Sequence, residues 1–143
     1  MTWQQEARER LAETGQRVGS ARAAVIDFLG EQSCCLGAQE IHEALAAGGA
    51  RIGLASVYRA VDSLVDVGVV QRVEVGDGIA RYEPARGGAG HHHHLVCDDC
   101  GKLEPFHDDA LEAAIEAVER STGYAVASHD VVLHGACTDC RPA

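Results

Sequence analysis

Residues 54–83 read LASVYRAVDSLVDVGVVQRVEVGDGIARYE, and the periodicity of this stretch changes in the middle. Val57, Val61 and Leu64 recur at helical spacing, which predicts a helix with one apolar face. The segment that follows alternates apolar and polar residues on both sides of the Gly-Asp-Gly at 76–78. Such alternation around a glycine-rich turn is typical of a β-hairpin. The stretch therefore predicts a helix that leads directly into a hairpin.

Three further helical patterns precede this stretch. Trp3, Ala7 and Leu11 recur at helical spacing, and Gly15 is expected to end that first helix. Ser20 is the expected N-cap of a second helix, ARAAVIDFLG, and a third helix runs through AQEIHEALAAGG. Four helices followed closely by a hairpin predict a winged helix-turn-helix, although the pattern leaves an unspecific small α/β domain open.

The domain organisation follows from a composition change. The winged helix-turn-helix would occupy residues 1–83, and the glycine-rich PARGGAG at 84–90 predicts a hinge. Residues 91–143 then predict a small α/β domain with strands HHLVC and KLEPF, a helix from about Asp108 to Ser121, and a long strand YAVASHDVVLH. The expected fold class is therefore α+β.

Composition bounds the class of protein. The 143 residues include 46% apolar residues, which supports a packed core. No apolar run is long enough for a membrane span, and the acid-rich N-terminus is not a signal peptide. We therefore expect a cytoplasmic protein without membrane partners, in which six reduced cysteines indicate metal binding or redox chemistry before disulfides. The net charge of −10 alone argues against nucleic-acid binding.

The cysteines include two C-x-x-C pairs, Cys97 with Cys100 and Cys137 with Cys140. Each pair can bind one ion from a tight turn, and four thiolates complete the closed tetrahedral shell that structural Zn²⁺ prefers. The alternative is a pair of redox-active dithiols, whose C-x-x-C normally opens a helix after a strand. The first pair here lies between predicted strands and the second at the chain end, so structural zinc is the favoured interpretation.

The histidine run His91–His94 leads directly into the strand of the first cysteine pair. If this strand begins within the run, side chains alternate between its faces, so His92 and His94 point one way and His91 and His93 the other. That alternation predicts two partial metal sites on opposite faces. Imidazole suits several transition metals, so the histidines do not select the ion. A polar tract that binds no ion is the alternative.

The segments GLASVYRAVDSL and HHHHLVCDDCGK, followed by the terminal C-x-x-C, resemble the ferric uptake regulator family of metal-dependent repressors. The resemblance covers about Thr14 to Cys140, with the motifs in the family's order. It implies a homodimer whose N-terminal domain binds double-stranded operator DNA and whose C-terminal domain dimerises and binds metal. It implies no small organic substrate.

The resemblance also implies three metal sites. The structural zinc ligands match Cys97, Cys100, Cys137 and Cys140. A second regulatory site matches His91, His93, Glu112 and His129. The sensing site between the two domains matches Cys35, Glu83, His92 and His94.

Cys35 departs from the pattern of the iron-type members, which have histidine at that position. A thiolate softens the site and favours Zn²⁺ over Fe²⁺. Zinc-sensing members, however, usually supply a cysteine after the wing, where this chain has YEPARGG. Zinc is therefore the favoured regulatory metal and iron the runner-up. From the residues alone, Cys34 and Cys35 can also be two small buried hydrophobes, and Cys34 is assigned a structural role.

The resemblance makes the helix at 54–66 the recognition helix. Its implied DNA contacts, together with one arginine that would enter the minor groove, match Arg17, Ser56, Tyr58 and Arg59. Arg22 and Arg72 could hold the DNA backbone or be solvated charges, and Tyr58 could instead be a core aromatic. Metal at the sensing site would fix the angle between the two DNA-binding domains of a dimer, so that both half-sites are reached.

The expected function is therefore a metal-responsive repressor of metal homeostasis genes, with zinc uptake favoured. An iron-responsive or peroxide-sensing repressor of the same family is the first alternative. A zinc-binding interaction module without DNA binding is an alternative of another class. An enzyme is not expected, because the sequence has no nucleophile motif or phosphate loop and four cysteines would leave no open position on zinc.

Overall fold

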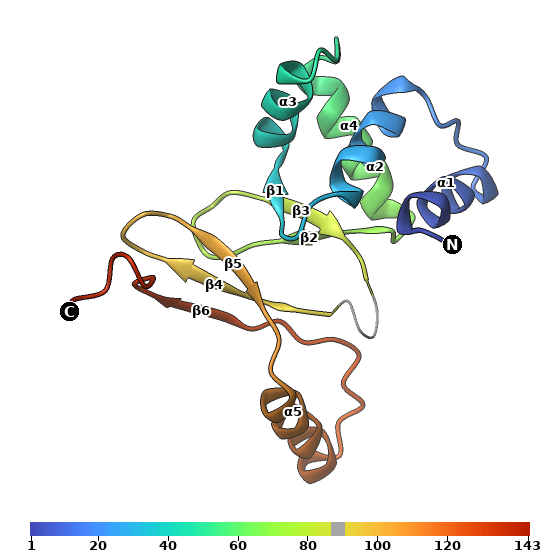
Figure 1. Cartoon of the computed structure of the whole chain (residues 1–143). Helices are drawn as coiled ribbons and strands as arrows, with labels where there is room; N and C mark the ends of the chain where they lie inside the picture. Colours follow the sequence, from blue (N-terminus) through green and yellow to red (C-terminus); the bar gives the residue numbers. More distant parts are fainter. Residues whose placement is uncertain (87–90) are drawn as a thin grey trace. The chain divides into compact units, whose positions relative to one another are not determined.

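The computed structural model describes residues 1–86 and 91–143. The chain forms two compact units, Met1–Gly87 and Gly88–Ala143, which we call the N-terminal unit and the C-terminal unit. The predicted α+β fold class is confirmed, with a winged helix-turn-helix in the first unit and a small α/β arrangement in the second (Figure 1). Among the described residues, every helix is too short or too polar to cross a membrane.

The N-terminal unit contains all four predicted helices and the predicted hairpin. Its elements are α1 (Trp3–Glu13), α2 (Ser20–Gly30), β1 (Leu36–Gly37), α3 (Ala38–Ala47), α4 (Leu54–Asp66), β2 (Val70–Val73) and β3 (Arg81–Pro84). The strands form an antiparallel sheet in the order β1-β3-β2, and Figure 1 shows the helices gathered on one side of it. The two-residue strand β1 was not predicted, because so short a segment has no readable alternation.

Helix α1 is preceded by a residue with a capping side chain, whereas α2 is preceded by a glycine whose backbone is extended. Thr2 caps α1 in a capping box with Gln5, as a polar side chain before a helix is expected to do. The N-cap of α2 is Gly19, and Ser20 is the first helical residue, so the predicted cap is off by one position. An N-cap needs extended backbone, and this conformation falls on Gly19, with φ −75° and ψ 176°.

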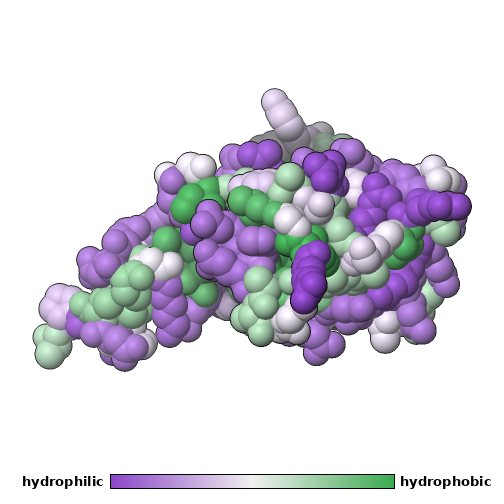
Figure 2. Space-filling view, turned by 90° about the horizontal axis from the view of Figure 1, so that it is seen from above, coloured by the Kyte–Doolittle hydropathy of each residue, from purple (hydrophilic) through white to green (hydrophobic). Residues whose placement is uncertain are grey.

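One apolar core holds the N-terminal unit together. Its helical part is formed by Ala7, Leu11, Val25, Ile26, Leu29, Ala38, Ile41, Val57, Ala60, Val61 and Leu64. Tyr82 and two valines before and within β2 complete it, and the Trp3 indole N–H donates to the Val69 carbonyl at 3.0 Å. The face drawn in Figure 2 is mostly hydrophilic, with apolar residues in small groups.

The wing is a tight hairpin whose turn needs glycine. Gly76 and Gly78 have φ of 91° and 78°, which side chains disfavour. Between them, the Asp77 carboxylate accepts from the Ile79 amide at 3.1 Å and pairs with Arg81 at 2.8 Å. Pro84 of the predicted hinge completes β3, and Ala85 donates to the carbonyl of Val69. The rest of the hinge at 87–90 lies outside the described residues.

The C-terminal unit contains β4 (His93–Cys97), β5 (Leu103–Phe106), α5 (Asp109–Thr122) and β6 (Val132–Gly135). β4 is central, antiparallel to β5 and parallel to β6, with α5 in the crossover. Asp108 caps the start of α5, and Gly123, with φ 74°, ends it. The predicted strand at 124–134 is too long. The paired register with β4 starts at His94 with Val132, and before it only the Val131 carbonyl accepts from the His94 amide at 3.1 Å.

The described residues of the C-terminal unit form no aliphatic core. Among its described residues, only His93, His94 and Cys97 are buried. α5 buries nothing, and Figure 1 shows it beyond the end of the sheet rather than over a face. Several large apolar side chains are exposed, namely Leu95, Val118, Tyr124, Val126 and Leu133. A unit that buries so little apolar surface needs bound metal or a partner to be stable.

Candidate metal centres and nucleic-acid interface

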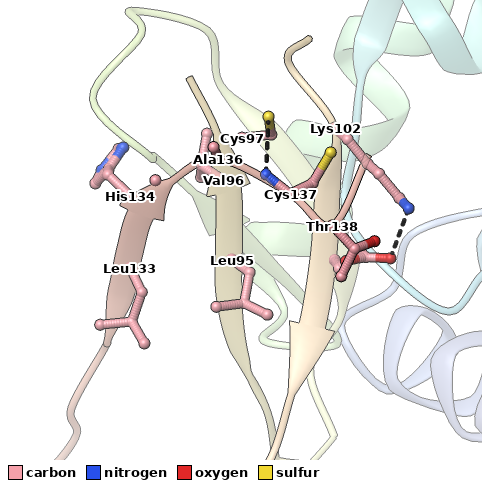
Figure 3. A pocket seen from close by; sticks show the side chains of 11 residues that line it. Leu95, Val96, Cys97, Lys102, Leu133, His134, Ala136, Cys137 and Thr138 are labelled. Carbon is pink, nitrogen blue, oxygen red and sulfur yellow. Dashed lines mark hydrogen bonds and ion pairs between the residues drawn. The ribbon is translucent and has the colours of Figure 1, made fainter. Parts of the chain in front are cut away.

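The four cysteines of the two C-x-x-C pairs come together at one end of the C-terminal sheet. The parallel register pairs Cys97 with Gly135, so the turns that follow β4 and β6 lie side by side (Figure 3). All four sulfur atoms lie within 4.8 Å of one another, and the Sγ atoms of Cys100 and Cys137 are 3.8 Å apart. Tetrahedral zinc with bonds of about 2.3 Å needs sulfurs about 3.8 Å apart, so this cluster fits structural zinc.

Backbone amides prepare Cys97 for a metal. Its sulfur accepts from the amides of Cys100 at 3.5 Å and Cys137 at 3.3 Å. These bonds, that from Cys100 above all, lower the pKa of Cys97 to about 6, which favours the thiolate that binds metal. The turn closes with the Gly101 amide bonded to the Cys97 carbonyl at 2.9 Å, and Gly101 has φ 78°. The cluster is thus built from two amide-lined turns.

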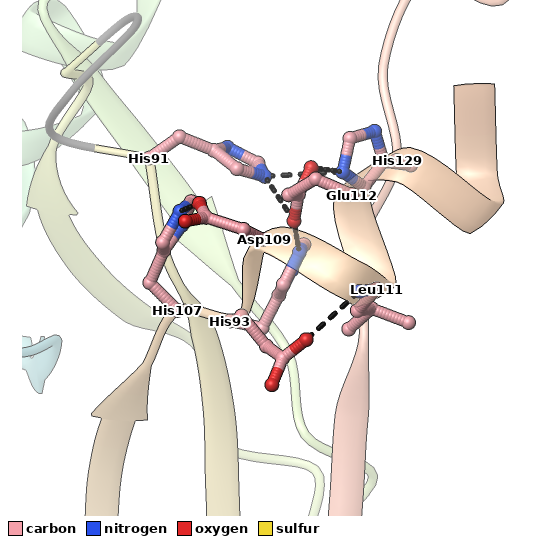
Figure 4. A network of polar contacts seen from close by, with 8 residues as sticks. His91, His93, His107, Asp109, Leu111, Glu112 and His129 are labelled. Carbon is pink, nitrogen blue, oxygen red and sulfur yellow. Dashed lines mark hydrogen bonds and ion pairs between the residues drawn. The ribbon is translucent and has the colours of Figure 1, made fainter.

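A second cluster joins three elements of the C-terminal unit. His91 lies two residues before β4, His93 is the first residue of β4, Glu112 comes from α5 and His129 from the segment before β6 (Figure 4). Glu112 contacts the Nε2 atoms of His93 at 2.5 Å and His129 at 2.8 Å, one with each carboxylate oxygen. His91 and His129 approach to 3.1 Å between Nε2 atoms. Three imidazoles and a carboxylate around one point suit a divalent transition metal.

The protonation states of this cluster favour metal binding. Hydrogen bonds from His93, and then His129, lower the pKa of the Glu112 carboxyl, so this group is ionised. Burial lowers the pKa of His91, helped by the neighbouring His93. A histidine binds metal only when neutral, so both effects prepare ligands at neutral pH.

We expect Zn²⁺ binding at this cluster to weaken as the pH falls. An imidazole ordinarily has a pKa of about 6.5, and the lowered pKa of His91 keeps that ring neutral well below pH 7. Protons compete for the histidines in acid, so affinity should drop by roughly a hundredfold between about pH 7.5 and about pH 5.5. Chelator competition on the wild-type chain and on Glu112→Gln isolates the cluster, and equal affinity at both pH values would contradict the assignment.

The residues of the predicted sensing site are divided between the two units. In the N-terminal unit, β1 pairs Leu36 with Tyr82, so the next position of the ladder sets Cys35 opposite Glu83. Hydrogen bonding with Cys34, followed by burial, raises the pKa of the Cys35 thiol. In the C-terminal unit, the rings of His92 and His94 lie with centroids 5.1 Å apart. Each unit thus presents one half of the predicted ligand set.

Three of the four predicted DNA contacts line one hollow of the N-terminal unit. Arg17, Ser56 and Arg59 share it with Arg22, and Arg59 donates to the Ser56 hydroxyl at 3.0 Å. Tyr58 lies elsewhere, 46% exposed beside the start of α3 and the wing, so it is not a core aromatic. The hollow holds three arginines and a serine hydroxyl beside the start of α4, and these are groups that commonly contact DNA phosphates.

The partners of three supporting side chains, Arg22, Arg72 and Gln71, were not assigned from the sequence. Arg22 donates to the Arg17 carbonyl at 2.6 Å and to the Ser63 hydroxyl at 3.0 Å, so its guanidinium holds the loop before α2 against α4. Arg72 forms an ion pair with Glu74 at 2.8 Å. Gln71 donates to Glu83 at 2.6 Å. The hairpin register predicts that last pair, but nothing in the spacing of Arg22 indicates its internal partners.

Comparison with known proteins places these features in context. The sequence profile of the ferric uptake regulator family matches residues 13–134. The ferric uptake regulation protein of Bacillus subtilis (strain 168) is 36% identical over 107 residues, covering 74% of this chain and 72% of that protein. The peroxide operon regulator of the same organism is 29% identical, covering 94% and 91%. The crystal structure of the Vibrio cholerae ferric uptake regulator matches with a TM-score of 0.80 at 30% identity, covering 91% of this chain and 98% of that chain.

Proposed function

Because this chain belongs to the ferric uptake regulator family of metal-responsive repressors, we propose that it binds operator DNA as a homodimer when its regulatory sites hold metal. The regulated genes would be those of metal homeostasis, with zinc uptake as the first assignment. The observation that carries the proposal is the convergence of His91, His93, Glu112 and His129. This set is separate from the four-cysteine cluster, and we assign it to regulation and the four cysteines to structure.

The homodimer is supported by the surface of the C-terminal unit. Leu95 on β4 and Leu133 on β6 are 37% and 49% exposed, and Val118 on α5 is 58% exposed. A second copy would cover such side chains and supply the apolar core that the described part of the unit lacks. Operator half-sites bound by a two-fold dimer have a fixed spacing, so a dimer is also what the winged helices need.

The regulatory metal is proposed to be Zn²⁺. The reason is the thiol of Cys35, which prefers softer ions to Fe²⁺ where the iron-type pattern has an imidazole. Cys35, Glu83, His92 and His94 are proposed as one sensing set. Ligands from both units would then restrain the angle between them, and a shift from mostly open to mostly closed needs roughly 5 kcal/mol of preference for the closed form.

A peroxide-sensing regulator is the second candidate. The specific observation is the adjacent Cys34 and Cys35, whose sulfurs are 4.0 Å apart, in a chain 29% identical to a peroxide operon regulator. In this candidate, oxidation of these two thiols by peroxide, rather than loss of metal, would be the signal that releases the DNA. The two candidates differ in what releases the DNA, which is chelation for the zinc regulator and peroxide for the other.

The decisive experiment is DNA binding titrated separately with Zn²⁺, Fe²⁺, Mn²⁺ and Ni²⁺, using the promoter region of the protein's own gene. We expect Zn²⁺ to give binding at the lowest free concentration, and a chelator to reverse it. Preference for Fe²⁺ would make the protein an iron regulator. Binding abolished by peroxide with metal retained in excess would favour the second candidate, and no binding under any condition would leave an interaction module.

Arg59→Ala is expected to weaken operator binding roughly tenfold to a hundredfold, because a cation of the proposed recognition helix α4 is lost. If Arg59 contacts phosphate, a plot of the logarithm of affinity against the logarithm of salt concentration should become shallower by about one unit. Arg8→Ala is the matched control, since Arg8 is bonded to Asp27 at 2.6 Å and lies outside the hollow. Fluorescence anisotropy at several salt concentrations measures both, and equal behaviour of the two variants would remove Arg59 from the interface.

A further inference from the structure

Cys34 and Cys35 form a pair of neighbouring thiols in the N-terminal unit. Their Sγ atoms are 4.0 Å apart, close to the 3.8 Å between Cys100 and Cys137 in the four-cysteine cluster. Two thiolates on one tetrahedral ion are separated by about 3.8 Å, whereas a disulfide needs about 2.05 Å. The spacing therefore matches two sulfurs that share an ion.

A third ligand faces this pair across the sheet. A carboxylate oxygen of Glu83 lies within 4.8 Å of both sulfurs. The register of β1 with β3 brings it there, because Leu36 is paired with Tyr82, and in this antiparallel pair Cys35, just before Leu36, lies opposite Glu83, just after Tyr82. The loop before β1 and the strand β3 both belong to the N-terminal unit, so these three side chains meet without any residue from the other unit.

Two neighbouring residues support this cluster, one by a hydrogen bond to the carboxylate and one by its positive charge. Gln71, the direct partner of Glu83 in the sheet, donates its amide N–H to Oε1 of Glu83 at 2.6 Å. That bond fixes the orientation of the carboxylate, as neighbours of metal ligands commonly do. Arg81 carries a positive charge that acts on Cys35, and its ion pair with Asp77 at 2.8 Å holds it in place.

We propose that Cys34, Cys35 and Glu83 form a thiolate-rich binding site for a soft divalent cation within the N-terminal unit, with both sulfurs bonded to the same ion. The inference rests on the proposed sensing site and extends it, because the family pattern supplies one ligand from the loop before β1, whereas this chain supplies two. Binding releases the two thiol protons to solvent and forms two metal–sulfur bonds. Such a site prefers Zn²⁺, Cd²⁺ or Co²⁺ to Mn²⁺, which binds oxygen ligands.

Cobalt is a suitable probe, because thiolate-to-Co²⁺ charge transfer absorbs in the near ultraviolet in proportion to the number of sulfurs bound. The full chain, with zinc retained in the four-cysteine cluster and all thiols reduced, is titrated with Co²⁺ under anaerobic conditions. Zinc content is measured before and after, so that exchange at the other cluster is detected. Cys34→Ser and Cys35→Ser are compared with Ser33→Ala, a neighbouring exposed residue outside the cluster.

We expect each cysteine variant to lose about half of the charge-transfer absorption per bound Co²⁺, and the double variant to lose all of it, while Ser33→Ala keeps it. Zn²⁺ affinity should fall at least tenfold in Cys34→Ser. Full absorption in Cys34→Ser overturns the proposal, as does the absence of thiolate absorption in the wild-type chain.

A measurement on the unmodified protein guards against a folding defect in the variants. Excess Zn²⁺ should slow alkylation of Cys34 at least tenfold, as mapped by mass spectrometry, and unchanged alkylation contradicts the proposal. A failure of the proposed function is recognised separately. It would leave the cobalt absorption and the protection of Cys34 intact while metal has no effect on DNA binding.

Discussion

Cys97→Ser is expected to release the structural zinc and to unfold the C-terminal unit while the N-terminal unit stays folded. Cys97 is the buried member of the four-cysteine cluster, and its sulfur accepts hydrogen bonds from two backbone amides. Serine has no thiolate with which to bind zinc in the same place. Structural zinc contributes on the order of 10 kcal/mol in small domains. The C-terminal unit has no buried aliphatic residue among those described, so nothing there can compensate for such a loss.

Zinc content and circular dichroism with thermal melting test this expectation. The N-terminal unit has its own apolar core, so the variant should keep one unfolding transition and its helical signal from α1–α4. Thr138→Ala is the control, because Thr138 lies in the turn between Cys137 and Cys140 without supplying a sulfur. Unchanged zinc content and melting in Cys97→Ser would show that the cluster is not the structural site.

His92→Ala is expected to abolish metal-dependent operator binding while the protein stays folded and dimeric. His92 is proposed as a sensing ligand, and it lies outside the four-cysteine cluster and the histidine–glutamate cluster. Removing one ligand should take away much of the roughly 5 kcal/mol that favours the closed form. Metal stimulation of DNA affinity should therefore fall at least a hundredfold.

The measurement pairs operator affinity, with and without Zn²⁺, with the oligomeric mass of the same sample. His134→Ala is the matched control, because His134 is a histidine of the same unit that bonds Asp98 at 3.2 Å and is in none of the ligand clusters found among the described residues. A His92→Ala protein that still responds normally to metal would remove His92 from the sensing set. Loss of the dimer would instead indicate a structural role.

The fold was predictable where a local pattern carries it. The helical spacing of Val57, Val61 and Leu64 and the alternation around the wing turn correspond to α4, β2 and β3. The long strand expected at 124–134 was wrong because β-branched residues indicate extended backbone but not whether a partner strand exists beside it. Pairing depends on β4, which begins at His93 and reaches this segment only at the Val131 carbonyl and the residues after it.

The candidate sites were predictable to different depths. The spacing of Cys97, Cys100, Cys137 and Cys140 by itself predicts a closed four-sulfur shell, because each pair fits one turn. The grouping of Glu112 with the histidines came from the family resemblance, since α5 lies far from them in sequence. The sequence assigns Cys34 a structural role, because its relation to Glu83 depends on the register of a two-residue strand that no pattern reveals.

The scarcity of buried apolar side chains in the C-terminal unit links the amount of intact repressor to the supply of its ligands. A ligand that binds only the native state raises the free energy of unfolding with the logarithm of its concentration. For a protein that is stable only as a dimer, a higher concentration of the protein itself has the same effect. Severe zinc starvation would then deplete the molecule itself, through exposure of the half that carries the four cysteines to proteolysis. Recovery from starvation would require newly synthesised chains as well as fresh metal.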